Sequence, residues 1–117
     1  MAFSEKSEEL VKELIQAEYD NACKQAKKEF NDNYVDRYHS LFEGYAILKE
    51  EVEEVKELIE CFDNDFYRLW TYIKANNPQL INVYANGLKI NAEETIKELA
   101  QVCAVFTKLL NTLEKAE

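Results

Sequence analysis

Apolar residues recur at intervals of three to four positions along most of the chain, which is the spacing of one face of an α-helix. The first run follows Ser4 and Ser7, either of which can cap a helix, and acidic residues come just after each serine. Polar residues 31–33 are expected to end this N-terminal helix, which accounts for the segment 1–33. The solvated face of this helix mixes acidic and basic side chains and indicates no chemistry. The apolar members of the run are Leu10, Val11, Leu14, Ile15, Ala22, Cys23, Ala26 and Phe30.

The same spacing predicts several further helices, separated by polar breaks. A second helix is expected over about 41–62 and a third over about 64–75, either separate or joined with a break near Asp63. An Asn-Asn-Pro sequence ends the third helix, because proline cannot continue a helix and restricts the residue before it. A weaker stretch at 79–90 suggests a short helix and a turn. The last helix is expected to begin with Asn91 as its cap and to run to about residue 113.

The composition fits a single all-α domain that covers all 117 residues. Two glycines and one proline leave little turn material for a β-fold, and 47% apolar residues argue against disorder. We therefore expect an antiparallel helical bundle of four to five helices, with the helix of 1–33 followed by helices over 41–113. The three cysteines lie in apolar helical patterns at wide spacings, which predicts buried, reduced thiols and a cytoplasmic protein.

The net charge narrows the classes of partner. The formal net charge of −9 would be repelled by a nucleic-acid backbone, so direct nucleic-acid binding is not expected. A surface for a basic protein and carboxylates that hold divalent cations are both compatible with this charge. No apolar run approaches the ~18 residues of a membrane span, and the first residues lack the apolar core of a signal peptide. A membrane protein is therefore not expected.

Two pairs of oxygen-bearing side chains fall at the border of apolar helical faces. On a helical wheel of ~100° per residue, Glu51 lies inside the apolar arc of the second helix and Glu54 lies at its edge. Glu98 lies within the arc of the last helix, and Gln101 lies at its edge one turn later. An ionised carboxylate near a core is costly unless something compensates it, so the two pairs call for an explanation.

A divalent cation would compensate these carboxylates, which would otherwise repel one another and take up protons. Hard oxygen ligands select Mg²⁺ or Mn²⁺, and the facing helices of a bundle commonly supply such ligands. A di-iron site would want Glu-x-x-His pairs, and the single histidine, His39, follows neither pair. The alternative is that the four side chains pair with Lys or Arg where two helices pack together, or that they lie only along the border of the core.

The stretch that contains the first pair also resembles a known family. Residues 50–54, Glu-Glu-Val-Glu-Glu, fit the E-E-x-x-E motif of MazG-like nucleotide pyrophosphohydrolases, an all-α group. Residues 42–51 resemble a helix of the short phage and bacterial MazG-like proteins, with Phe42 in place of the usual His. The run 98–104, followed by Lys108, also fits that subgroup, so the likeness covers most of the chain.

The resemblance implies Mg²⁺- or Mn²⁺-dependent hydrolysis of a nucleoside triphosphate to a monophosphate and pyrophosphate. The implied metal ligands are Glu51, Glu54, Glu98, Gln101 and, as a compensating carboxylate one turn earlier, Glu94. Gln101 stands where the family has Asp, and its neutral amide lowers the negative charge of the site by one, which would reduce or alter the activity. Glu50 or Glu54 would orient the attacking water.

Two more side chains are candidate substrate contacts. Lys108 shares the edge of the last helix on which Gln101 lies and would hold a terminal phosphate. A helix-end lysine that meets the C-terminal dipole explains Lys108 equally well. Trp70 would stack on a base, unless it is a core residue. The resemblance also implies a homodimer or a higher homo-oligomer, because members of the family assemble their core across subunits.

Two other functions remain open on the sequence. One is a non-catalytic acidic interaction protein, of phage origin, that binds a basic partner surface through its net charge of −9. The other is a structural helical bundle that has no ligand. Binding of Mg²⁺ or Mn²⁺ that is lost when Glu51 or Glu98 is changed to Gln would separate the metal-dependent hydrolase from both.

Overall fold

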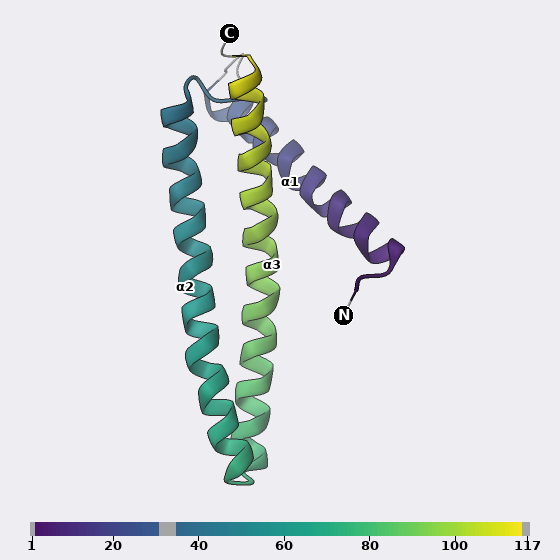
Figure 1. Ribbon diagram of the computed structural model, residues 1–117, viewed down its shortest axis with the longest axis vertical. Coiled ribbons are helices and arrows are strands. Elements are labelled where there is room, and N and C mark those ends of the chain that lie inside the picture. Colours follow the sequence, from purple (N-terminus) through teal and green to yellow (C-terminus); the bar gives the residue numbers. More distant parts are fainter. Residues whose placement is uncertain (1, 31–34, 116–117) are drawn as a thin grey trace. The chain divides into compact units, whose positions relative to one another are not determined.

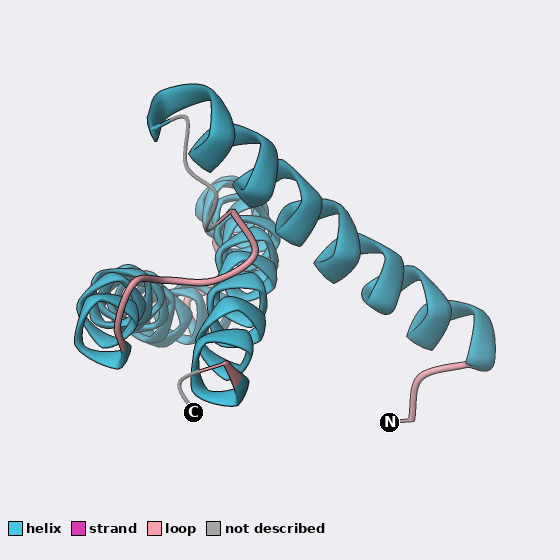
Figure 2. Cartoon of the chain, turned by 90° about the horizontal axis from the view of Figure 1, so that it is seen from above, coloured by secondary structure: helices cyan, strands magenta, loops and turns pink. Residues whose placement is uncertain are grey.

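The computed structural model describes residues 2–30 and 35–115, and within these ranges every regular element is an α-helix (Figures 1 and 2). Helix α1 spans Glu5–Phe30, α2 spans Leu41–Lys74 and α3 spans Pro78–Glu114. The predicted all-α class is confirmed. We expected four to five helices, but the described ranges contain three. The reason is that α2 and α3 each continue through positions where a break was expected. None of the three is long and apolar enough to span a bilayer.

Side-chain caps fix where the helices begin. Ser4 Oγ accepts a hydrogen bond at 3.1 Å from the backbone N–H three residues later, as α1 starts. Ser40 Oγ caps α2 in the same way at 3.1 Å, and Asn77 Oδ1 caps α3 at 3.2 Å. Pro78 follows Asn77 as the first helical residue, where its missing N–H leaves no bond unmade. The first two helices thus start where expected, whereas the predicted end of the first at 31–33 lies outside the described residues.

The end of α2 depends on an asparagine in a left-handed conformation. Asn76 has a φ of 53°, which few residues other than glycine and asparagine adopt readily. Its N–H donates to the Ile73 carbonyl at 3.0 Å, and the Asn77 N–H donates to the Tyr72 carbonyl at 3.1 Å. These two hydrogen bonds form a Schellman motif, which satisfies carbonyls at the end of the helix. The helix therefore ends here, as the Asn-Asn-Pro sequence predicts.

Two breaks expected from the sequence do not occur. Asp63 lies inside α2, and the whole of 79–90 lies inside α3. Asn86 is accommodated in α3 because its Nδ2 donates to the Asn82 carbonyl at 2.9 Å. Asn91 is not a helix cap; its Nδ2 donates instead to the Leu58 carbonyl of α2 at 3.1 Å. Tertiary contacts of this kind stabilise helix at positions where local propensity predicts a turn.

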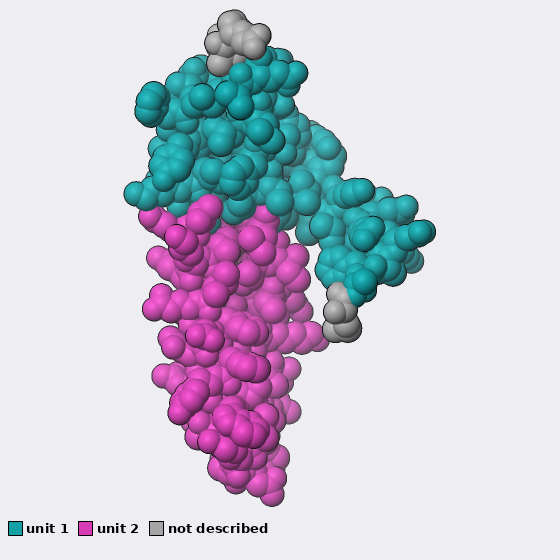
Figure 3. All heavy atoms as spheres, viewed as in Figure 1, with its two compact units in different colours: residues 1–51, 100–117 teal, residues 52–99 magenta. Residues whose placement is uncertain are grey.

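The chain divides into two compact units (Figure 3), and unit 2 comprises Val52–Leu99. In this unit α2 and α3 run antiparallel away from their short connection. The ring centroids of Tyr72 and Tyr84 lie 5.2 Å apart near that connection. Val55 and Leu88 are the buried apolar residues of the unit. Unit 2 is therefore a helical hairpin with a small core.

Unit 1 comprises Met1–Glu51 and Ala100–Glu117, and it contains α1. The segment before α2 is tied to α3, because Asn111 Nδ2 donates to the Asp36 carbonyl at 2.8 Å. The same Nδ2 donates to the Tyr19 hydroxyl of α1 at 3.1 Å, so one amide links three segments. A Cβ on Gly44 would meet Leu109 Cδ1 at 2.7 Å. This contact shows how closely the start of α2 approaches α3.

Four buried residues of α3 are small or polar and come every four residues, which is the spacing of one helix face; they are Ala100, Ala104, Lys108 and Thr112. Leu88 and Val102 of α3 are also buried. Phe106, Leu110 and Leu113, by contrast, are exposed.

The three cysteines are free, and Cys61 is exposed, so the expectation of buried thiols is wrong for this residue.

Candidate metal centre

Three glutamates place their carboxylates together, two from α2 and one from α3. Glu54 and Glu98 belong to the helical hairpin of unit 2. Glu51 lies one turn before Glu54 on the same unbroken helix. One carboxylate oxygen from each of the three lies within 4.8 Å of the others. The structure thus brings together the three carboxylates that the helical wheels single out.

The burial of these glutamates matches their places on the wheels. Glu51 and Glu98 are half-buried and the Oε2 atom of each is fully buried, whereas Glu54 is exposed. Burial removes water from a charged oxygen, and a neighbouring negative charge raises the cost further. A small divalent cation with oxygen ligands would offset both costs. The arrangement therefore has the chemistry of a site for a hard cation.

The other three carboxylate and amide candidates take different places. Gln101 lies one turn after Glu98, is half-buried, and lines a cavity of unit 1 together with Glu51. Glu94 is exposed, and its Oε1 pairs with Lys97 Nζ at 3.1 Å. Glu50 is exposed on α2, next in sequence to Glu51. Of these three residues, Gln101 is the one whose surroundings resemble those of the cluster.

Trp70 is not brought to the carboxylates within one chain. It lies about four and a half turns beyond Glu54 on α2, which is about 24 Å along a helix axis. Its side chain is 54% exposed, so it is not the core residue of the alternative prediction. The Lys74 ammonium lies 5.4 Å from the centroid of its ring. A role for Trp70 beside these carboxylates would therefore need a second copy of the chain.

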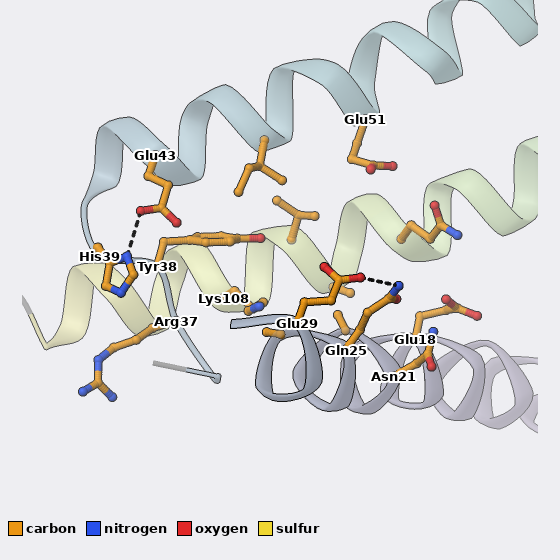
Figure 4. A pocket seen from close by; sticks show the side chains of 16 residues that line it. Glu18, Asn21, Gln25, Glu29, Arg37, Tyr38, His39, Glu43, Glu51 and Lys108 are labelled. Carbon is orange, nitrogen blue, oxygen red and sulfur yellow. Dashed lines mark hydrogen bonds and ion pairs between the residues drawn. The ribbon is translucent and has the colours of Figure 1, made fainter. Parts of the chain in front are cut away.

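Lys108 lies in the wall of a cavity of about 460 Å³ in unit 1, formed by α1, the start of α2 and the end of α3 (Figure 4). It is only 6% exposed, and its ammonium lies 5.0 Å from the centroid of the Tyr38 ring. Burial raises the pKa of the Tyr38 phenol to about 12, and the negative charges of Glu43 and Glu51 add to the rise. Lys108 is thus a buried cation rather than a solvated helix-end lysine.

Helix α1 supplies one wall of this cavity, although its sequence pattern indicated no chemistry there. Asn21 and Gln25 project from it beside the small residues Ala22 and Ala26, and Glu18 precedes them by one turn. A polar row next to two alanines on an amphipathic helix is the signal that could have found this wall. It is weak, because solvated faces have the same composition.

Comparison with protein-family models, with curated proteins and with solved structures found no match. The likeness to MazG-like proteins therefore stays a prediction from the quoted motifs. The chemistry of the site has to be argued from the residues themselves.

Three carboxylates from two helices can bind a cation, and the cavity that Glu51 also lines can admit a small polar molecule.

Proposed function

We propose that the protein is a Mg²⁺-dependent nucleoside triphosphate pyrophosphohydrolase-like enzyme. The overall reaction adds water to a nucleoside triphosphate and yields a nucleoside monophosphate and pyrophosphate. One observation carries the proposal: carboxylate oxygens of Glu51, Glu54 and Glu98 lie within 4.8 Å of one another, and two of these residues have a buried oxygen. The E-E-x-x-E stretch at residues 50–54, which resembles MazG-like enzymes, supplies the reaction class.

The donor set fits Mg²⁺ or Mn²⁺. All three side chains offer hard, negatively charged oxygens, and neither histidine nor cysteine belongs to the group. A cation held there supplies neutralisation of charge on phosphate oxygens and activation of water. Gln101, one turn after Glu98, would add a neutral amide oxygen where the family has a carboxylate. The cluster would therefore hold a cation less tightly than one with four carboxylates.

The chain's own residues have separate tasks in this proposal. Glu51, Glu54 and Glu98 would hold the cation through their carboxylate oxygens. Glu54 is the exposed member, so it is the one whose second oxygen can accept a proton from an attacking water. Glu50 is also exposed, but it lies at a different angle on α2. We therefore assign the water-orienting role to Glu54 before Glu50.

The proposal includes self-association, for which the exposed apolar residues of unit 2 give the reason. Ile59, Phe66 and Ile73 recur every seven residues on α2, so they share one face, and all three are exposed. A hairpin of two helices has too few layers to cover such a face by itself. Two hairpins packed together would form a four-helix bundle, which buries it.

Pyrophosphate release from a panel of canonical and modified nucleoside triphosphates, with and without Mg²⁺, tests the activity. We expect metal-dependent release that Glu54→Gln abolishes and that Glu57→Gln leaves intact. Glu57 is a matched control, because it is an exposed glutamate on the same helix and the exchange removes the same charge. Metal binding without release from any nucleotide would instead favour the acidic interaction protein. Release that persists in Glu54→Gln would contradict the assigned role.

A further inference from the structure

Acidic side chains outnumber basic ones in the wall of the unit 1 cavity (Figure 4). Four glutamates line it, and they are Glu18, Glu29, Glu43 and Glu51. Besides burial, the negative charges of Glu43 and Glu51 raise the pKa of the Tyr38 phenol, so both carboxylates lie near this ring. The basic side chains of the wall are Arg37, His39 and Lys108. Since Arg37 already pairs with an aspartate at 3.2 Å, the cavity favours a ligand that carries more positive than negative charge.

Lys108 is the buried basic group of this acidic wall. Its exposure is 6%, and its ammonium lies 5.0 Å from the centroid of the Tyr38 ring. Within residues 2–30 and 35–115, this ammonium makes no ion pair and no hydrogen bond. A cation–π contact recovers only part of the hydration that burial removes. A ligand that offers one negatively charged acceptor to Lys108 would therefore be held more firmly than a ligand that carries cations alone.

The surroundings of Lys108 favour a ligand in which opposite charges lie close together. An anion at its ammonium comes near the Tyr38 ring, and thus near Glu43 and Glu51 as well. These two carboxylates would repel a doubly charged anion. A single carboxylate with an ammonium group on the neighbouring carbon avoids this repulsion, because the ammonium can face the glutamates. This pair of groups is the head group of an α-amino acid.

The opposite end of the cavity offers a carboxylate to a second cation. Figure 4 shows Glu18 and Glu51 toward one end of the cavity, and Arg37 and His39 toward the other. Glu18 is half-buried on α1, and in the described part of the chain its carboxylate makes no ion pair and no hydrogen bond. Glu51 also belongs to the carboxylate cluster, so Glu18 is the carboxylate at this end that serves the cavity alone.

Small apolar side chains line the middle of the cavity. Ala22 and Ala26 belong to α1, and Ala104 belongs to α3, one turn before Lys108. Methylene groups that packed against these alanines would be removed from water. The cavity volume of about 460 Å³ lies in the range of small-molecule sites. The wall thus provides a cation, an apolar middle and a carboxylate for an aliphatic chain that is charged at both ends.

We propose that the unit 1 cavity binds a basic α-amino acid of the type of lysine or arginine. Its carboxylate lies at Lys108, its α-ammonium faces Glu43, and its side-chain cation pairs with Glu18. The methylene groups between the two ends pack against the alanines of α1 and α3. This binding goes beyond the proposed hydrolase function and does not rest on it, because it requires neither a nucleotide nor a metal.

Isothermal titration calorimetry of the unchanged chain in EDTA tests the proposal with two series of ligands. L-lysine is compared with cadaverine, which lacks the carboxylate, and with L-norleucine, which lacks the side-chain cation. L-arginine is compared in the same way with agmatine and L-citrulline. We expect at least one of the two amino acids to bind, and to bind more tightly than both of its analogues by roughly tenfold or more. Each analogue loses one charge-assisted hydrogen bond, which accounts for the difference.

Two variants assign the ends of the ligand to their partners. Lys108→Gln should abolish the preference for the amino acid over its decarboxylated analogue, and Glu18→Gln should abolish the preference over the analogue without the side-chain cation. The matched controls are Lys89→Gln on α3 and Glu13→Gln on α1, which change exposed residues away from the cavity and should keep both preferences. Because Glu18 is only half-buried, its variant tests the proposal even if Lys108→Gln fails to fold.

The proposal is overturned if neither amino acid binds, if the analogues bind as tightly as the amino acids, or if the cavity variants behave like their controls. EDTA removes metal, so these results are independent of turnover. A chain that binds lysine or arginine but releases no pyrophosphate would contradict the proposed function alone. A chain that releases pyrophosphate but binds neither amino acid would contradict this inference alone.

Discussion

The backbone N–H of Tyr38 donates a hydrogen bond to Thr112 Oγ1 at 2.8 Å, and both residues are buried. The same hydroxyl donates to the Lys108 carbonyl at 2.8 Å, one turn earlier on α3. The Thr112 hydroxyl therefore joins the segment before α2 to the helix that carries Lys108. It also holds the Tyr38 ring next to the Lys108 ammonium.

Thr112→Val keeps the shape of the side chain and removes both hydrogen bonds. The Tyr38 N–H would stay buried without its acceptor, so we expect the free energy of unfolding to fall by about 1–3 kcal/mol. Urea denaturation followed by circular dichroism measures the change. Thr71→Val is the matched control, because the Thr71 hydroxyl donates only to the Tyr67 carbonyl on an exposed helix face. An equal loss in both variants would mean that the tertiary hydrogen bond contributes nothing.

Substitution by alanine should have opposite effects on stability at the two glycines, Gly44 and Gly87. A Cβ on Gly44 would lie 2.7 Å from Leu109 Cδ1 and 2.9 Å from Tyr38 Cδ2. The leucine methyl can move, but the buried Tyr38 ring is held, so Gly44→Ala should destabilise unit 1. We expect a strain of about 1–3 kcal/mol, of which the better helix propensity of alanine offsets up to about 1 kcal/mol.

Gly87→Ala supplies the comparison, because nothing lies within 4 Å of a Cβ at that position. Gly87 lies inside α3, where alanine favours the helix by about 1 kcal/mol. The midpoint of urea denaturation should therefore rise for Gly87→Ala and fall for Gly44→Ala. A rise in both variants would show that α2 and α3 are less closely packed at Gly44 than described.

The helical class and the starts of α1 and α2 could be predicted from the sequence, whereas the start of α3 and the continuity of the helices could not. Ser4 and the Asn-Asn-Pro sequence act locally, so their effect can be read from a few residues. Asn91 looks like a cap by the same local rule. Its amide instead bonds to Leu58, a residue far away in the sequence, and the helix continues through it. The expected breaks were wrong because they relied on local propensity alone.

The candidate site divides in a similar way. Glu51, Glu54 and Glu98 could be found because a charged residue on an apolar face is visible on a helical wheel. The wall formed by α1 could not, because Asn21 and Gln25 lie on an ordinary polar face until the tertiary fold is known. Lys108 was found, but its burial depends on Tyr38, which precedes α2 and makes no periodic pattern with α3.

Self-association should depend on the apolar face of α2 in unit 2. Phe66 is 57% exposed and lies on the face shared with Ile59 and Ile73. Phe66→Glu should therefore dissociate the oligomer to a monomer, because a charge within an apolar interface is not compensated. Sedimentation velocity over a range of concentrations measures this. Asn64→Glu adds the same charge to an exposed position on another side of α2 and should leave the oligomer intact. A monomer at all concentrations for the unchanged chain would contradict the four-helix arrangement.

The cluster of Glu51, Glu54 and Glu98 makes one prediction that does not depend on the identity of any nucleotide. Titration calorimetry of Mg²⁺ and Mn²⁺ should show binding to the unchanged protein. Glu54→Gln and Glu98→Gln should each weaken it by roughly tenfold or more, equivalent to about 1.4 kcal/mol. Glu57→Gln should leave the affinity unchanged. Without metal, the two cluster variants should be at least as stable as the unchanged protein, because each removes a like charge. Absence of cation binding, or an equal loss in Glu57→Gln, would contradict a metal site at these three carboxylates.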